Sequence, residues 1–76
     1  MREREKLLNH IGISIKNARL KAGLTQEEVA FTAQLSRSYY SGIERGVRNV
    51  SSINLMRIAT VIGADVGQFF PKIQSA

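Results

Sequence analysis

The 76-residue sequence has no cysteine and no tryptophan, and it has one proline and one histidine. Without cysteine the chain can form neither a disulfide nor a thiolate metal site, which is typical of cytoplasmic proteins. The histidine is accompanied by a single aspartate, Asp65, and no glycine-rich phosphate-binding loop is present. This inventory offers little for catalysis. We therefore predict that the protein is not an enzyme and uses no metal, cofactor or small-molecule ligand.

Long hydrophobic runs are also missing. No stretch reaches the length of a membrane-spanning helix, and the first ten residues carry charges instead of the apolar segment of a signal peptide. We expect a cytoplasmic protein with no membrane partner, forming one small domain over residues 1–76. Aromatic residues are only 7% of the chain, which favours a helical core of Ile, Leu, Val and Ala over a sheet sandwich.

Positive charge is what the chain has in excess. Eleven Lys and Arg stand against six Asp and Glu, giving a net charge of +5. Between residues 35 and 64 the only acid is Glu44, and the basic residues there are Arg37, Arg45, Arg48 and Arg57. Such a surface favours an anionic partner such as nucleic acid. Small basic domains without this role are common, so charge alone leaves the question open.

Residues 25–46 read as two short helices joined by a tight turn. Thr25 and Glu28 form a capping box at the first helix, Ser36 can cap the second, and Gly46 ends it. A face of small residues on the first helix allows the second to cross closely, as in a helix-turn-helix: Val29, Ala30 and Ala33. The outer side of the second helix would then face a DNA groove with Arg37, Ser38, Ser41 and Gly42.

Three more helices complete an all-α, five-helix bundle with its core over about residues 11–70. We place them at residues 6–22, at 51 or 52 to 62, and at 65–70, where Asp65 and Gln68 repeat the capping-box pattern. Residues 1–5 lack an apolar face and are expected either to fray or to extend the first helix into solvent. The chain from Pro71 onward is expected to be loose.

The helix ending at residue 62 is apolar nearly all round, so it requires burial on two sides. Ile53, Met56 and Val61 lie off its main apolar stripe, and Phe69 and Phe70 follow soon after. We favour a symmetric dimer interface built from these five residues. The alternative is that the N-terminal helix covers them.

The chain resembles the Cro/cI-type helix-turn-helix regulators in LTQEEVA at 24–30, in Leu35-Ser36 and Tyr40-Ser41, and in Ile43-Glu44 and Gly46. The resemblance spans about residues 11–70. It implies a lambda-repressor-like DNA-binding domain that binds operator DNA as a two-fold dimer, with the second motif helix in the major groove. The run RSYYSGIERGVRNVS is most similar to the controller proteins of restriction–modification systems, which act on their own promoter region.

The resemblance also implies residue roles. Gln26 would contact a phosphate, Ser36 would cap the helix and touch a phosphate, and Arg37 and Ser38 would read base edges. For Tyr39 a contact with a thymine methyl or phosphate competes with packing on the bundle, and Ser41 is a weaker DNA candidate. Arg45, Arg48 and Asn49 suit flanking phosphates. Glu44 would pair with Arg19 for structure. Gln34 stands where the family often has glycine, and Val50 where many relatives have proline.

Together these observations predict a sequence-specific DNA-binding transcriptional regulator. It would bind a palindromic operator as a homodimer and regulate its own operon, in its finer form as a restriction–modification controller. The alternative is a helix-turn-helix protein-interaction module such as an antitoxin.

Overall fold

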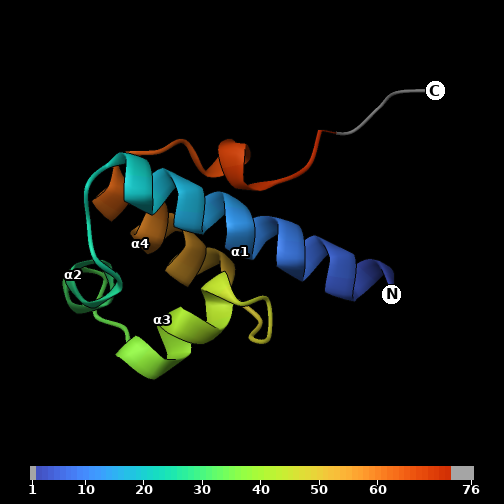
Figure 1. Ribbon diagram of the computed structural model, residues 1–76, viewed down its shortest axis with the longest axis horizontal. Coiled ribbons are helices and arrows are strands. Elements are labelled where there is room, and N and C mark those ends of the chain that lie inside the picture. Colours follow the sequence, from blue (N-terminus) through green and yellow to red (C-terminus); the bar gives the residue numbers. More distant parts are fainter. Residues whose placement is uncertain (1, 73–76) are drawn as a thin grey trace.

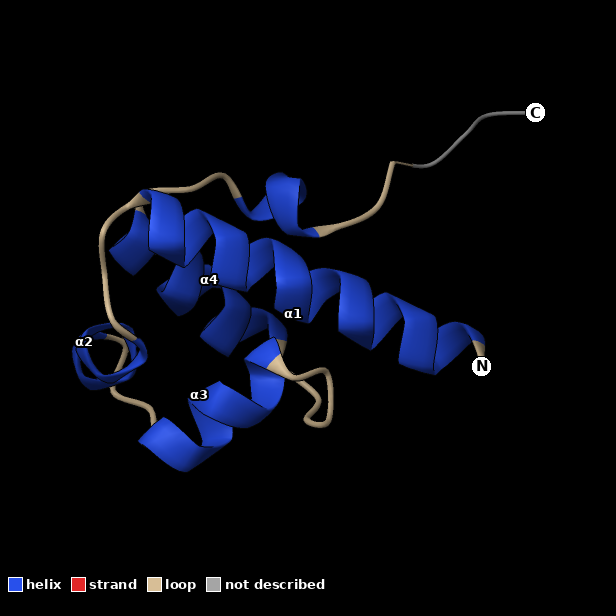
Figure 2. Ribbon diagram, viewed as in Figure 1, coloured by secondary structure: helices blue, strands red, loops and turns tan. Residues whose placement is uncertain are grey.

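Four α-helices and one short 3-10 helix make up the computed structural model, which describes residues 2–72. The α-helices are α1 (Glu3–Lys21), α2 (Gln26–Thr32), α3 (Arg37–Glu44) and α4 (Ser52–Ile62), and the 3-10 helix is η1 (Val66–Phe69). In Figure 1, α1 runs along the length of the molecule, with α2 and α3 on one side of it and η1 on the other. Figure 2 draws only helix and loop, and residues 2–72 contain no strand, which confirms the all-helical prediction.

The first helix begins at Glu3, earlier than the predicted start at residue 6. Arg2 takes the N-cap position without a side-chain hydrogen bond, so no capping residue marks this start in the sequence. Residues 3–5 are exposed and helical. Of the two alternatives for the N-terminus, extension of the helix into solvent is therefore the correct one for these residues.

The fifth helix differs from the prediction because it is a four-residue 3-10 turn and not an α-helix. The predicted capping box is present: the Asp65 side chain accepts from the Gly67 N–H at 3.2 Å, and the Gln68 side chain accepts from the Asp65 N–H at 3.1 Å. Pro71 follows too closely for a longer helix to form. Pro71 and Lys72 lie in exposed loop. The remainder of the tail that we expected to be loose lies outside the described residues.

One hydrophobic cluster forms the core. Each helix contributes a fully buried side chain to it, and these are Ile15, Val29, Tyr40, Ile58 and Phe69. None of the helices over residues 2–72 is long and apolar enough to cross a membrane. The two short helices α2 and α3 are therefore held in place by a core to which the whole described chain contributes.

The prediction that Phe69 lies at a dimer interface is wrong. Its side chain is 0% exposed within the subunit, so it has no surface to offer a partner. The 3-10 helix has three residues per turn, which places Val66 and Phe69 on the same side, toward the bundle. Phe70, the next residue, is turned outward and is 43% exposed.

Candidate nucleic-acid interface

Side-chain caps fix where the two motif helices begin. The Thr25 hydroxyl accepts from the Glu28 N–H at 3.0 Å, and the Glu28 carboxylate accepts from the Thr25 N–H at 2.8 Å. At the start of α3 the Ser36 hydroxyl accepts from the Tyr39 N–H at 3.1 Å. Each cap satisfies an N–H group that has no partner inside the helix. Both predicted helix starts are confirmed.

The turn between α2 and α3 forces Gln34 into a left-handed conformation, with φ at 62°. The chain reverses here because the Leu35 N–H donates to the Ala30 carbonyl at 2.8 Å. A residue with a β-carbon pays about 1–2 kcal/mol for this conformation, whereas glycine does not. The departure from the family pattern noted at Gln34 therefore carries a local cost.

A buried ion pair joins α1 to α3. The Arg19 Nε lies 2.6 Å from Glu44 Oε2, and Arg19 Nη2 lies 3.1 Å from Glu44 Oε1, so the contact is bidentate. The two side chains are 8% and 2% exposed, respectively. The remaining Arg19 donor, Nη1, reaches the Leu24 carbonyl at 2.9 Å, at the entrance to the motif. The predicted pair of Arg19 with Glu44 is confirmed, and its role is to hold α3 against α1.

Hydrogen bonding decides the charge state of this cluster. Burial would raise the pKa of Glu44, but hydrogen bonds from Arg19 and Gln26 outweigh it and hold the pKa below its ordinary value. The hydrogen bond to Glu44 raises the pKa of Arg19. Burial and the neighbouring Glu44 carboxylate raise the pKa of the Tyr40 hydroxyl well above its usual range. At neutral pH the pair is therefore ionised and the tyrosine is neutral.

Gln26, for which a phosphate contact is predicted, also has a partner inside the chain. Its Nε2 donates to Glu44 Oε1 at 2.8 Å, so the amide nitrogen is held inside the cluster. Glu44 can accept from both Arg19 and Gln26 because a carboxylate has several lone pairs. The first residue of α2 thus ties α2 to α3.

Tyr39 packs on the bundle, which is the second of the two alternatives stated for it. Its ring is half-buried against the core, and its hydroxyl donates to the Asn49 carbonyl at 2.9 Å. The Asn54 Nδ2 approaches the same hydroxyl at 3.4 Å. Tyr39 therefore holds the loop after α3, and in this arrangement its hydroxyl proton is engaged within the chain.

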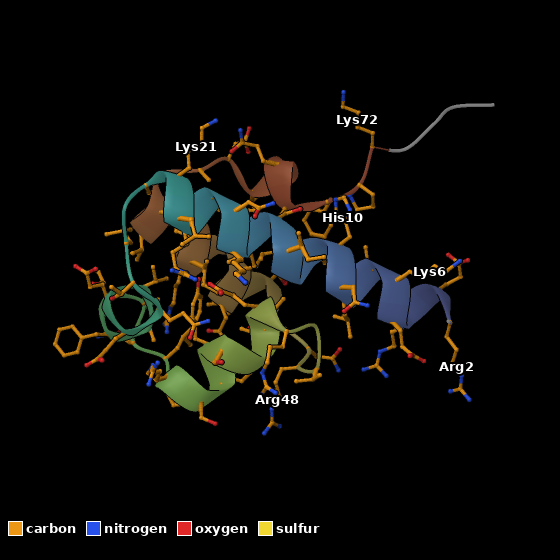
Figure 3. All side chains as sticks on the ribbon, in the orientation of Figure 1. Arg2, Lys6, His10, Lys21, Arg48 and Lys72 are labelled. Carbon is orange, nitrogen blue, oxygen red and sulfur yellow. The ribbon has the colours of Figure 1, made fainter. Side chains whose placement is uncertain are left out.

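The other predicted DNA-contacting residues share one stretch of α3 and the loop that follows it. Most are exposed: Ser36, Arg37, Ser38, Arg45, Arg48 and Asn49; Ser41 is half-buried. Figure 3 shows Arg48 beside α3, projecting away from α1, whereas Lys21 and Lys72 project from the opposite side of the molecule. These polar and basic residues thus lie at the N-cap of α3, along it or in the loop after it, whereas Glu44 of the same helix is turned into the interior.

The prediction that Gly42 leaves the outer side of α3 uncovered where it would approach a DNA groove is wrong. It is buried, and a β-carbon on it would lie 2.5 Å from Arg48 Cγ. The aliphatic part of Arg48 covers this position. Sequence reasoning also missed Gly12, where a β-carbon would lie 2.5 Å from the carbonyl oxygens of both Ile43 and Glu44. Both glycines mark close contacts, Gly42 with a residue six positions on in the loop after α3 and Gly12 with residues more than 30 positions away, and no helical periodicity in the sequence distinguishes them.

The predicted dimer residues divide into two places. Ile53 and Met56 are 68% and 53% exposed, and with half-buried Val61 they line an apolar groove beside the end of α2. The other lining residues of this groove are Thr32, Ala33, Gln34, Arg57 and Thr60. Phe70 is exposed but does not line this groove. Over residues 2–72 there is no cluster of histidine and acidic side chains that could hold a metal ion.

A family model described as helix-turn-helix matches residues 15–69, and the chain belongs to this family. A control protein, C.MunI from Mycoplasma sp, is 43% identical over 54 residues, which are 71% of this chain and 73% of that protein.

Two solved structures show the same fold. The restriction-modification controller protein C.AhdI from Aeromonas hydrophila superposes with a TM-score of 0.80 at 40% identity, covering 83% of this chain and 96% of that one. The controller protein C.Esp1396I, bound to a 19 base pair DNA duplex, superposes with a TM-score of 0.74 at 37% identity, covering 82% and 83%. The chain therefore shares both sequence and fold with restriction–modification controller proteins.

Proposed function

We propose that this protein is a sequence-specific DNA-binding transcriptional regulator. The observation that carries the proposal is the inward position of Glu44. It is the only acid between residues 35 and 64; inside the bundle Arg19 neutralises its charge and Gln26 donates a further hydrogen bond to it. The outer side of α3 and of the loop after it therefore presents positive and polar groups without a compensating negative charge. A DNA backbone is the complementary surface.

Within this surface we assign two kinds of contact. Arg37 and Ser38, in the first turn of α3, would enter the major groove, where arginine can donate bidentately to guanine O6 and N7 and serine can bond to several bases. Ser36, Ser41, Arg45, Arg48 and Asn49 would bind along the backbone and set the register without reading sequence. Gln26 and Tyr39 would act by holding the elements that carry these groups.

We further propose that the protein binds a palindromic operator as a homodimer. The groove of Ile53, Met56 and Val61 supports this, because it presents exposed apolar side chains that the same surface of a second copy could cover. In a two-fold dimer each α3 would enter one half-site, with half-sites spaced by about 34 Å, one turn of DNA. The control and controller proteins to which the chain is similar support the finer proposal, a regulator of its own operon in a restriction–modification system.

The test is fluorescence anisotropy of the purified protein with the DNA just upstream of its own gene. A scrambled duplex of the same length is the control, and both are titrated at several salt concentrations. Binding at least about a thousandfold tighter to the upstream DNA is expected. Equal and steeply salt-dependent binding to both duplexes would contradict autoregulation through this site and leave a nonspecific basic domain. Failure to bind either duplex would contradict DNA binding and favour the alternative of a protein-interaction module.

A further inference from the structure

The loop after α3 is folded back onto the helix that precedes it. The Val47 N–H donates to the Gly42 carbonyl at 3.0 Å, and the Asn49 carbonyl accepts from the Tyr39 hydroxyl at 2.9 Å. Arg48 lies between these two anchors. Its backbone position is therefore fixed from both sides, and only its side chain is free to change direction.

The side chain of Arg48 crosses α3 at Gly42. A β-carbon on residue 42 would lie 2.5 Å from Arg48 Cγ, 3.5 Å from Cβ and 3.6 Å from Cδ. Carbon atoms in contact stay about 3.5–4.0 Å apart, so the contact with Cγ could not be kept. Gly42 is buried although it lies on the outer side of a surface helix, because Arg48 covers it. The guanidinium group beyond Cδ then projects from the α3 side of the molecule (Figure 3).

We propose that Gly42 is a positioning residue for Arg48. The missing β-carbon forms a seat on which the aliphatic stem of Arg48 lies, and this seat directs its guanidinium along α3 to a phosphate next to the half-site. The inference rests on the proposed function, because it concerns how one contact with the DNA backbone is positioned. An alanine at residue 42 would push the stem off the helix, and the two loop anchors would prevent the backbone from following.

The seat also explains why glycine stands inside an eight-residue helix. Glycine in a helix interior is less favourable than alanine by about 1 kcal/mol, so its presence requires a compensating reason. The φ of Gly42 is not positive, unlike that of Gly23, Gly46 and Gly63. Backbone conformation therefore does not require glycine here, and the contact with Arg48 does.

The experiment is a double-mutant cycle on DNA binding with Gly42→Ala, Arg48→Ala and the double variant. We expect Arg48→Ala to weaken binding about eightfold at 0.1 M salt and to lower the slope of log K against log salt by about 0.9, the effect of one phosphate contact. Gly42→Ala should show the same loss and the same change of slope. The double variant should lose no more than either single variant. Gly67→Ala is the matched control, because a β-carbon there meets only Asp65 Oδ1 at 3.8 Å.

Thermal unfolding separates positioning from folding. Gly42→Ala should unfold at the same or a higher temperature than the wild type, because the displaced arginine is exposed and alanine favours helix. If Gly42→Ala does not fold, the double variant must fold, since the Cβ of residue 48 is at an ordinary contact distance. Failure of the double variant to fold would overturn the proposal.

Three binding outcomes would also overturn it: Gly42→Ala binding with wild-type affinity and slope, losses that add in the double variant, or Arg48→Ala without effect. Each leaves DNA binding by the wild type intact. Loss of the proposed function itself appears separately, as a wild-type protein that binds no duplex.

Discussion

Gly12 of α1 lies directly against the main chain of Glu44 on α3, so close that a β-carbon would come within 2.5 Å of the Glu44 carbonyl oxygen. The side chain of the same Glu44 binds Arg19, two helical turns further along α1. The two contacts fall on one face of α1, because residues seven apart in an α-helix point the same way. α3 is thus attached to α1 through both its backbone and its last side chain.

Gly12→Ala is expected to destabilise the protein. An added β-carbon in a closely packed contact costs about 1–3 kcal/mol or more, and the backbone carbonyls it meets cannot move away as a flexible side chain can. This outweighs the gain of about 1 kcal/mol that alanine brings to a helix. Thermal unfolding measures the net effect, with exposed Asn17→Ala on the same helix as control. A higher unfolding temperature for Gly12→Ala would contradict the close crossing.

Glu44→Gln is expected to cost about 3–5 kcal/mol at neutral pH, because it leaves the buried Arg19 charge without its partner. The pKa of Glu44 is lowered in the folded state, so the stabilisation that its carboxylate gives the fold is fully present above the pKa of glutamate in the unfolded chain, about 4.3. That contribution is lost as pH falls from there through the folded pKa. The stability difference between wild type and Glu44→Gln, measured by urea unfolding, should therefore shrink below about pH 4.3. A difference that widens in acid would contradict the ion pair, and Glu27→Gln serves as the exposed control.

Gln34→Gly is expected to stabilise the protein by about 0.5–1 kcal/mol, since glycine adopts the left-handed conformation at no steric cost. The gain is reduced by the greater freedom of glycine in the unfolded chain. The position is exposed, so little packing within the subunit is lost. Chemical denaturation provides the measurement. A lower midpoint with an unchanged slope would show that the Gln34 side chain contributes more than its backbone costs.

Arg37→Ala is expected to weaken operator binding by about 1–3 kcal/mol and to relax the preference at one base position. The reason is that a bidentate contact to guanine is lost while the backbone contacts remain. Competition with a set of single-base operator variants measures it. Equal loss against every variant would assign Arg37 to a phosphate instead.

Met56→Asp is expected to convert the dimer to a monomer, because it places a charge in the apolar groove beside Ile53 and Val61. Sedimentation at tens of micromolar measures the change. Leu20→Asp is the control, because Leu20 is 56% exposed and lies outside that groove. A wild-type protein that sediments as a monomer at this concentration would contradict the dimer proposal.

Structural features that depend on residues close together in the chain were predictable from the sequence. Thr25 and Ser36 cap α2 and α3 as expected, and of the two starts given for α4 the structure has the one capped by Ser51, because a cap involves residues only three apart. The start of α1 was misplaced for the same reason, since Arg2 makes no side-chain cap bond.

The roles of several site residues depend on partners distant in the chain. Gln26 bonds to a residue 18 positions away, and Tyr39 to one 10 positions away, so their side chains could not be placed by local pattern. The complete burial of Phe69 follows from how η1 packs on α1, which the capping box at Asp65 does not reveal. The ion pair of Arg19 with Glu44 was predictable only through the resemblance to a known family.

The two helices of the interface are short, with seven residues in α2 and eight in α3. Isolated helices below about 12–15 residues are marginal in water, so neither would persist outside the bundle. The binding surface can then exist only while the whole domain is folded, and binding and folding are thermodynamically linked. A duplex at one hundred times its Kd should raise the stability of the entire chain by about 2.7 kcal/mol. An operator would therefore protect the bound protein from unfolding, and the average lifetime of the whole pool would fall as the unbound fraction rises.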